Sequence, residues 1–379
     1  MKFRVLSGQP GFFEELLARK INVDGVVSAY LASKTQTVPV YLTEVPTHVC
    51  LILKQEMLSL GADAAIPASA IMERKENDCA LLLGNPTQYS KLAAKLADQP
   101  FGLKKLGIEI EKAVKNCLAP SEGTKIMGIL NITPDSFYDG GKSFDKTTVA
   151  ARVAELEMHS DIIDVGAESS RPGSDPVPAK EEIARLELFF GNIRTEKKIS
   201  LDTSKFEVFE NFLDKVDIIN DISGLADHRF IELLSTTAHD MVLMHMKGTP
   251  KTMQDNPVYE DVVSEIMDFF ESRLEALAKK NIPESRVILD PGIGFGKRFE
   301  DNIAILKQID SFRGFGARVL VGHSNKSFLK NVLGKDYNGM RIDATLGLSA
   351  YLALKKVDIL RVHEADRTVA ALRALNELG

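Results

Sequence analysis

Polar residues that could bind a ligand recur along the second two-thirds of the sequence, each at the end of a short apolar run. They combine acids and amides with cations: Asn131, Asp202, Asn220, Asp290, Lys326, Arg361 and His363. A carboxylate can accept two hydrogen bonds from a paired N–H edge. The cations suit an anion or a carbonyl, because the helix dipole disfavours positive side chains as caps of a helix N-terminus. The pattern therefore predicts a site for a donor-rich heterocycle next to a phosphate-like group.

The apolar runs before these residues predict buried strands, and helical patterns fill the gaps between them. We expect strands at 126–130, 161–165, 199–201, 217–219, 241–244, 287–289, 318–321 and 358–360. We expect helices at 147–158, 180–190, 205–213, 227–234, 259–280, 301–309, 338–355 and 366–378. Eight strands, each followed by a helix, are typical of a (β/α)₈ TIM barrel, whose active site lies at the C-terminal ends of the strands. An open doubly wound sheet is the alternative, but it usually has five or six parallel strands.

The length of 379 residues allows such a barrel and one further domain. A polar run with Pro and Gly at 118–124 predicts a linker. We therefore expect a small α/β domain of unknown role at 1–120 and the barrel at 121–379. In the first domain we expect strands at 40–42 and 79–83 and helices at 47–60 and 87–96. Pro39 suits a strand start or an edge strand, and Thr87 is expected to cap the second helix.

Composition excludes several classes of protein. The chain is 44% hydrophobic and 26% charged, which rules out general disorder, collagen-like repeats and a coiled-coil rod. A formal net charge of −6 gives no global basic field, so we expect no nucleic-acid partner. The apolar runs are too short for a membrane span, and the N-terminus has no signal-peptide pattern. The three cysteines, Cys50, Cys79 and Cys117, predict buried, reduced thiols in the cytoplasm.

The loops after the predicted strands resemble those of the dihydropteroate synthase family. The two longest stretches are LNITPDSFYDGG at 130–141 and DVGAESSRPG at 164–173. Shorter motifs follow in the family's order at 220–224, 243–246, 289–297, 324–327 and 361–363. The resemblance spans about 125–379 and does not cover 1–120. Two positions depart from it: Asn325 replaces the usual arginine, so one cation is missing, and Ser170 stands where threonine is usual.

The resemblance implies a transferase of folate biosynthesis. Such enzymes condense 6-hydroxymethyl-7,8-dihydropterin diphosphate with 4-aminobenzoate and release diphosphate and 7,8-dihydropteroate. Family roles assign the pterin to Asp202, Asn220, Asp290 and Lys326, with Met244 and Phe295 lining the pocket. They assign the diphosphate to Asn131, Arg361 and His363, and Mg²⁺ to Asn131 and Asp139. They assign 4-aminobenzoate to Phe137, Ser170, Arg171, Pro172 and Ser327. The family commonly forms dimers, so the resemblance also implies a homodimer.

Other interpretations of the same residues fit less well. The glycine-rich run at 292–297 lacks the spacing and the Ser/Thr of an ATP-binding P-loop. His245, between Met244 and Met246, fits a barrel wall better than a metal site, because alternate strand residues face opposite sides. A pterin-binding methyltransferase that acts on methyltetrahydrofolate and a corrinoid protein would not share the two long loops. A non-catalytic pterin-binding protein or scaffold would not need Asn131, Asp139, Arg361 and His363.

Overall fold

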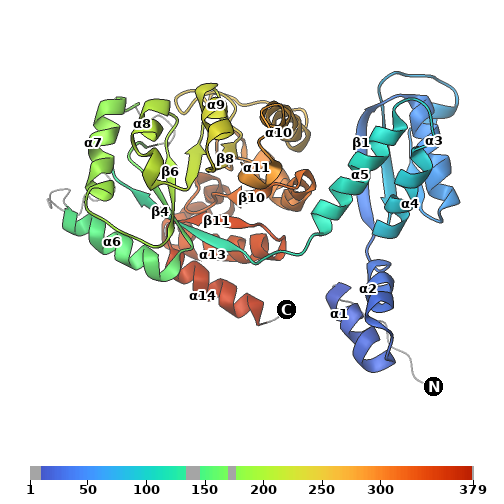
Figure 1. Cartoon of the computed structure of the whole chain (residues 1–379), viewed down its shortest axis with the longest axis horizontal. Helices are drawn as coiled ribbons and strands as arrows, with labels where there is room; N and C mark the ends of the chain where they lie inside the picture. Colours follow the sequence, from blue (N-terminus) through green and yellow to red (C-terminus); the bar gives the residue numbers. More distant parts are fainter. Residues whose placement is uncertain (1–9, 134–145, 170–175, 378–379) are drawn as a thin grey trace. The chain divides into compact units, whose positions relative to one another are not determined.

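The chain forms two compact units, Met1–Ala119 and Pro120–Gly379 (Figure 1). The structure, a computed structural model, describes residues 10–133, 146–169 and 176–377. Within those ranges, no helix is both long enough and apolar enough to span a bilayer.

The second unit is a closed barrel of eight parallel strands, in the order β10-β11-β4-β5-β6-β7-β8-β9. The strands are β4 (Lys125–Asn131), β5 (Ile162–Gly166), β6 (Lys198–Asp202), β7 (Ile218–Asp221), β8 (Asp240–Met244), β9 (Val287–Asp290), β10 (Arg318–Val321) and β11 (Ile359–Val362). The ring closes where β11 pairs with β4. The predicted TIM barrel is therefore confirmed, and the open sheet is excluded.

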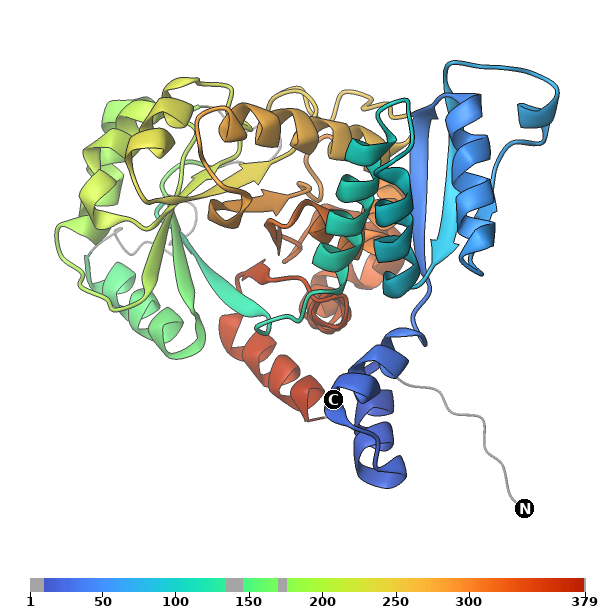
Figure 2. The ribbon, with the colours of Figure 1, turned by 45° about the vertical axis from the view of Figure 1, so that its right-hand side comes forward.

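Helices surround the ring of strands (Figures 1 and 2). The main ones are α6 (Lys146–His159), α7 (Ala179–Phe190), α8 (Phe206–Asn211), α9 (Arg229–Thr236), α10 (Val262–Ala278), α11 (Phe299–Lys307), α13 (Tyr337–Leu354) and α14 (Ala365–Asn376). Each corresponds to an expected helix, with ends shifted by up to three residues. A short additional helix, α12 (Lys330–Leu333), precedes α13.

The barrel buries its strands on both faces, which explains their continuous apolar sequences. The inner face carries one cluster of buried side chains: Met127, Ile162, Ile218, Val242, Ile288, Leu320 and Ile359. A larger cluster fills the space between strands and helices. Gly128 on β4 illustrates the close packing outside, because a Cβ there would lie 2.3 Å from Ser160 Oγ. The interior is thus a packed core, and only the ends of the barrel are open to a ligand.

Three aspartates stand just before strands: Asp161, Asp217 and Asp358. We expected them as first strand residues, but each strand begins one residue later. In each case one carboxylate oxygen accepts a backbone N–H of the neighbouring strand at 2.8 Å, from Ile126, Ile199 and Val319 respectively. These bonds satisfy backbone N–H groups at the N-terminal ends of the strands and fix the register of adjacent strands.

The first unit is built on a three-stranded antiparallel sheet in the order β1-β3-β2. Its strands are β1 (Val38–Val45), β2 (Asp63–Ala65) and β3 (Asp78–Gly84), and its helices are α1 (Pro10–Glu15), α2 (Gly25–Ser33), α3 (Thr47–Ser59), α4 (Pro86–Leu96) and α5 (Leu103–Leu118). Pro39 lies on β1, an edge strand, as predicted. The strand β2 and the helices α1, α2 and α5 were not predicted from the sequence.

Two smaller predictions for this unit are wrong. The cap of α4 is Asn85, not Thr87: Asn85 Oδ1 accepts the N–H of Gln88, whose side chain accepts the N–H of Asn85 in return. With Pro86 at the first helical position, this capping box starts the helix one turn before the apolar pattern. The cysteines are free, as expected, but only Cys50 is buried, while Cys79 and Cys117 are partly exposed.

Candidate functional site

The predicted site residues that the structure describes gather at one mouth of the barrel. Asn131, Asp202, Met244 and Asp290 are the last residues of β4, β6, β8 and β9, and Asn220 and Arg361 lie within the last two residues of β7 and β11. Phe295, Lys326, Ser327 and His363 follow β9, β10 and β11 in the connecting segments. Five others lie outside the described residues: Phe137, Asp139, Ser170, Arg171 and Pro172.

Arg361 occupies the centre of a partly buried ion-pair network across the mouth. Its Nε donates to Asp164 Oδ2 at 2.6 Å, and its Nη2 donates to Asp202 Oδ2 at 2.5 Å. Asn220 Nδ2 donates to the other oxygen of Asp164 at 3.1 Å. Because Asp164 is fully buried, its two bonds provide the partners that a desolvated carboxylate needs. The network fixes the side chains of β5, β6, β7 and β11 relative to one another.

Asp202 has an unusual electrostatic environment. Burial raises its pKa to about 7, and the neighbouring negative charge of Asp164 adds to the effect, while Arg361 opposes it. Gly166, opposite Asp202 in the strand register, leaves space at this point, since a Cβ there would lie 3.3 Å from Asp202 Cβ. Asp202 can therefore change its protonation state, and hence its role as an acceptor, near neutral pH.

A second group of charges lies at β9 and β10. Asp290 is buried, and its Oδ1 accepts the N–H of Gly292 at 2.8 Å. Burial raises the pKa of Asp290, while nearby positive charges, Lys326 first among them, oppose the rise. Burial lowers the pKa of Lys326 to about 8, and Asp290 opposes that shift. The ammonium of Lys326 stands 4.1 Å from the centre of the Phe295 ring, so a cation–π contact joins the two loops.

His363 is held by its neighbours rather than free to rotate. Its Nδ1 lies 3.0 Å from Ser324 Oγ, which also accepts the His363 backbone N–H at 3.3 Å. Ser324 Oγ donates to Glu364, and Asn325 Nδ2 donates to the other oxygen of the same carboxylate at 3.1 Å. Asn325 also has a positive φ of 56°, a conformation that asparagine tolerates better than most residues. Asn325 thus orders this turn through Glu364 without supplying a charge.

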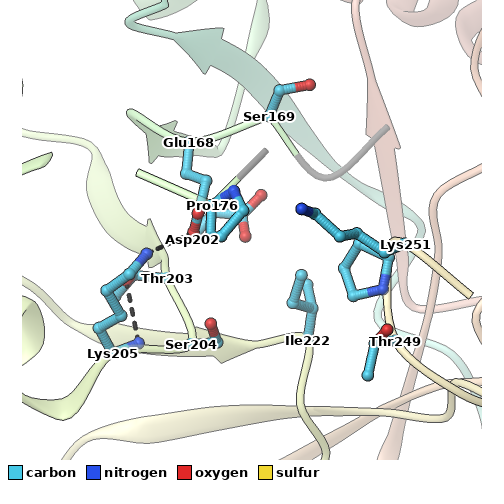
Figure 3. A pocket seen from close by; sticks show the side chains of 11 residues that line it. Glu168, Ser169, Pro176, Asp202, Thr203, Ser204, Lys205, Ile222, Thr249 and Lys251 are labelled. Carbon is cyan, nitrogen blue, oxygen red and sulfur yellow. Dashed lines mark hydrogen bonds and ion pairs between the residues drawn. The ribbon is translucent and has the colours of Figure 1, made fainter. Parts of the chain in front are cut away.

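A cavity of about 290 Å³ lies beside Asp202 (Figure 3). Its lining includes Glu168, Asp202, Lys205, Ile222 and Lys251. Lys205 Nζ binds Glu168 Oε2 at 2.5 Å and Glu182 Oε2 at 2.8 Å, so one lysine compensates two carboxylates. Glu168 Oε1 also accepts the N–H of Val177 at 2.7 Å. One wall of the cavity is therefore held by charge-assisted hydrogen bonds.

Three residues of this region had no predicted role: Asp164, Glu168 and Lys205. A signal for Asp164 was available, because it is the charged residue in the otherwise apolar run 162–166. A charge in a strand buried on both faces requires a partner. Glu168 and Lys205 lie 37 residues apart, and no pattern in the sequence indicates that they pair.

Comparison with known proteins supports a specific family. The family model described as "Pterin binding enzyme" matches residues 127–363. The chain belongs to the pterin-binding enzyme family. It is 32% identical over 367 residues to a bifunctional dihydropteroate synthase/dihydropteroate reductase of Helicobacter pylori, and the alignment covers 95% of each chain.

Two solved dihydropteroate synthases match the barrel alone. That of Xanthomonas albilineans with 4-aminobenzoic acid has a TM-score of 0.63 and 32% identity, covering 68% of this chain and 93% of its own. That of Anaplasma phagocytophilum with bound 6-hydroxymethylpterin-monophosphate has a TM-score of 0.60 and 32% identity, covering 68% of this chain and all of its own. The resemblance inferred from the loops is confirmed at the level of the family, and residues 1–119 are an addition to its barrel.

Proposed function

We propose that the barrel is a dihydropteroate synthase, which condenses 6-hydroxymethyl-7,8-dihydropterin diphosphate with 4-aminobenzoate to give 7,8-dihydropteroate and diphosphate. One observation carries the proposal: two carboxylates, the half-buried Asp202 and the buried Asp290, share one barrel mouth with the cations Lys326 and Arg361. Acceptors and cations together suit a substrate with a donor-rich ring and an anionic leaving group. The relatives with 4-aminobenzoic acid and with a pterin monophosphate support the same pair of substrates.

In this proposal the pterin lies among Asp202, Asn220 and Asp290. The carboxylates accept hydrogen bonds from the ring N–H and amino groups, and each charge-assisted bond contributes about 1.5–3 kcal/mol. Lys326 donates to a ring acceptor, and Met244 and Phe295 provide apolar contacts. If the bond to the leaving group breaks early, positive charge develops on the pterin. Asp202 and Asp290 then stabilise that charge as well as orient the ring.

The diphosphate is assigned to Asn131, Arg361 and His363. Arg361 provides a guanidinium, the side chain best suited to planar recognition of phosphate oxygens. Its bonds to Asp164 and Asp202 hold it at the mouth before the substrate arrives, so little conformational entropy is lost on binding. His363, fixed by Ser324, is similarly preorganised.

The donors present fit Mg²⁺, which the family generally uses. Among the described residues, no group of three or more His, Cys, Asp or Glu could form a metal cage. Mg²⁺ does not need one, because it usually takes one or two protein oxygens together with substrate phosphates and water. Asn131 would supply an amide oxygen, and Asp139, outside the described residues, would supply a carboxylate. When bound, the ion would offset charge on the departing diphosphate.

The second substrate needs little activation, because an aromatic amine is neutral at pH 7 and already nucleophilic. We assign 4-aminobenzoate to Ser327, after β10, and to Phe137, Ser170, Arg171 and Pro172, outside the described residues. Catalysis then depends on holding the amine nitrogen in line with the breaking C–O bond and on excluding water. The amine loses a proton after the new C–N bond forms.

Diphosphate release measured with purified full-length protein tests the proposal. We expect release to require the pterin substrate, 4-aminobenzoate and Mg²⁺ together. A folded protein that releases no diphosphate under these conditions would contradict the synthase assignment. Methyl transfer from methyltetrahydrofolate to a corrinoid protein would favour the methyltransferase, and pterin binding without turnover would favour the scaffold.

A second activity, reduction of dihydropteroate, is favoured by one observation. The alignment with the bifunctional Helicobacter pylori relative covers 95% of this chain and so includes most of residues 1–119, whereas the two solved synthases cover only 68% of it. Reduction requires a hydride donor, so the test is dihydropteroate-dependent oxidation of NADH or NADPH, with and without a flavin. We propose that 1–120 and 121–379 are separate domains. If deletion of 1–120 removes the reductase activity but leaves the synthase activity, the reductase activity belongs to the first domain.

We also propose a cytoplasmic homodimer. The free thiols of Cys50, Cys79 and Cys117 support the compartment, because reduced cysteines persist there. The dimer rests on family membership, and light scattering of the purified chain tests it. A mass of one chain at micromolar concentration would contradict the dimer.

A further inference from the structure

Lys297, a buried lysine behind the mouth of the barrel, has no part in the reaction proposed above. It is only 4% exposed. Its Nζ donates to the carbonyl oxygens of His245 at 3.2 Å and Phe295 at 3.0 Å, and lies 3.1 Å from His245 Nδ1. An ammonium has three N–H donors, and three acceptors surround this one. Every donor of the protonated amine is therefore satisfied inside the protein, which a buried ammonium requires.

This arrangement defines the state of His245. To accept a hydrogen bond at Nδ1, the imidazole must be neutral and carry its proton on Nε2. Burial lowers the pKa of His245 to about 3, and the charges of Lys297 and Lys247 act in the same direction. The ring also packs edge-on against Phe269, with 5.1 Å between ring centroids. His245 is thus a fixed, neutral acceptor at the end of β8.

The loop that ends at Lys297 approaches the segment after β8 more closely than side chains would allow. A Cβ on Gly292 would lie 2.0 Å from the carbonyl oxygen of His245, and one on Gly296 would lie 2.4 Å from that of Lys247. Both glycines have positive φ values. The glycine-rich run that resembles a P-loop only superficially therefore serves close backbone packing, and Lys297 bonds the two segments together.

Two site residues depend on this connection. The loop carries Phe295, whose ring contacts Lys326. Lys297 is also one of the positive charges, with Lys326 and Arg361, that oppose the raised pKa of Asp290. Burial lowers the pKa of Lys297 itself to about 7. Asp290 and Asp301 oppose that shift and Lys326 adds to it.

We propose that Lys297 is a positioning residue of the pterin site, which ties the Phe295 loop to the end of β8 and places a buried positive charge behind Asp290. The inference rests on the proposed function. It predicts that Lys297 affects pterin binding without touching the pterin. It also predicts that its effect depends on pH, because the charge is present below about pH 7 and lost above it.

The experiment compares full-length wild type with Lys297→Met, which keeps the length of the side chain and removes the charge and donors. Binding of 6-hydroxymethyl-7,8-dihydropterin is measured by calorimetry from pH 6 to pH 9. We expect Lys297→Met to bind about tenfold more weakly at pH 6, because the Phe295 loop loses its tie to the segment after β8 and Asp290 loses a neighbouring positive charge. The ratio of the two dissociation constants should shrink toward pH 9. Lys307→Met, on the exposed side of α11, is the matched control and should bind like wild type.

Lys297→Gln provides a second variant, which retains one polar donor group if the methionine variant does not fold. Circular dichroism establishes that each variant is folded. A folded variant with wild-type affinity, or with a ratio that does not change with pH, would overturn the inference, even if its stability is reduced. Failure of the wild type to bind the pterin would instead contradict the proposed function.

Discussion

The guanidinium of Arg361 lies 2.6 Å from the carboxylate of Asp164, although 197 residues separate them in the chain. The contact is possible because β11 and β5 both flank β4 in the closed barrel. Among the contacts that the structure describes, Asp164 binds two residues that are predicted to bind substrate, Arg361 and Asn220. It is therefore a support for two binding residues at once.

Asp164→Asn should impair turnover without removing a substrate contact. The amide cannot compensate the guanidinium charge, so Arg361 loses one of two anionic partners and becomes less well ordered. We expect kcat/KM for the pterin diphosphate to fall about 10- to 100-fold, or about 1.5–3 kcal/mol. Asp214→Asn, on an exposed turn, is the matched control. Wild-type kinetics in a folded Asp164→Asn variant would show that Arg361 needs no such support.

Asp290→Ala should abolish tight pterin binding while the barrel persists. Two charge-assisted hydrogen bonds to the ring would be lost, which corresponds to about 100-fold or more in affinity. The fold should tolerate the change, because Asp290 is buried at a cost that its raised pKa reflects. Calorimetry gives the affinity, and thermal unfolding checks the fold, with Asp268→Ala on α10 as control. Unchanged affinity would remove Asp290 from the pocket.

Pterin affinity should have a bell-shaped dependence on pH. Asp202 must be ionised to accept N–H donors, and its raised pKa of about 7 means that affinity increases as pH rises through 7. Lys326 must be protonated to donate, and its lowered pKa of about 8 means that affinity decreases above 8. We expect a maximum between about pH 7 and 8. Asp202→Asn should remove the acidic limb of the profile and keep the basic limb. If the acidic limb is unaltered, another group is responsible for it.

Lys205→Met should destabilise the barrel through the carboxylates it leaves behind. Glu182 is fully buried and would lose its cation, at a cost of about 2–4 kcal/mol in the free energy of unfolding measured with urea. Lys280→Met removes a pair of similar length, 2.8 Å to Glu232, but on the surface. That control should cost less than about 1 kcal/mol. Adding Glu182→Gln to Lys205→Met should restore part of the lost free energy of unfolding. If Lys205→Met and Lys280→Met destabilise the protein equally, the buried network does not contribute as proposed.

The barrel could be predicted because its strands are buried on both faces and its ligand-facing residues follow them directly. Asp202 and Asp290 end such apolar runs, so their place at the mouth follows from the fold. The partner of Arg361 could not be predicted, because it depends on which strands become neighbours when the ring closes. Lys297 belongs to a glycine-rich run, and nothing in the sequence shows that the lysine folds back onto His245.

The first unit was harder to predict for different reasons. β2 has only three residues, too few for an alternating pattern to emerge. By contrast, α5 does carry a helical pattern, with Leu103, Ile110 and Val114 buried on one face, and could have been found.

Closure of the ring by β11 against β4 has a consequence for biosynthesis. β4 is made before the other barrel strands and β11 after them, so β4 has an unpaired edge until the seven strands that follow it have left the ribosome. Arg361 is synthesised with β11, 197 residues after Asp164, so Asp164 lacks its cationic partner until then. An exposed strand edge and a buried acid without a partner both favour misassembly. We therefore expect the nascent chain to depend on chaperones until the final strand is released, and truncations that remove β11 to aggregate rather than to accumulate as partly active barrels.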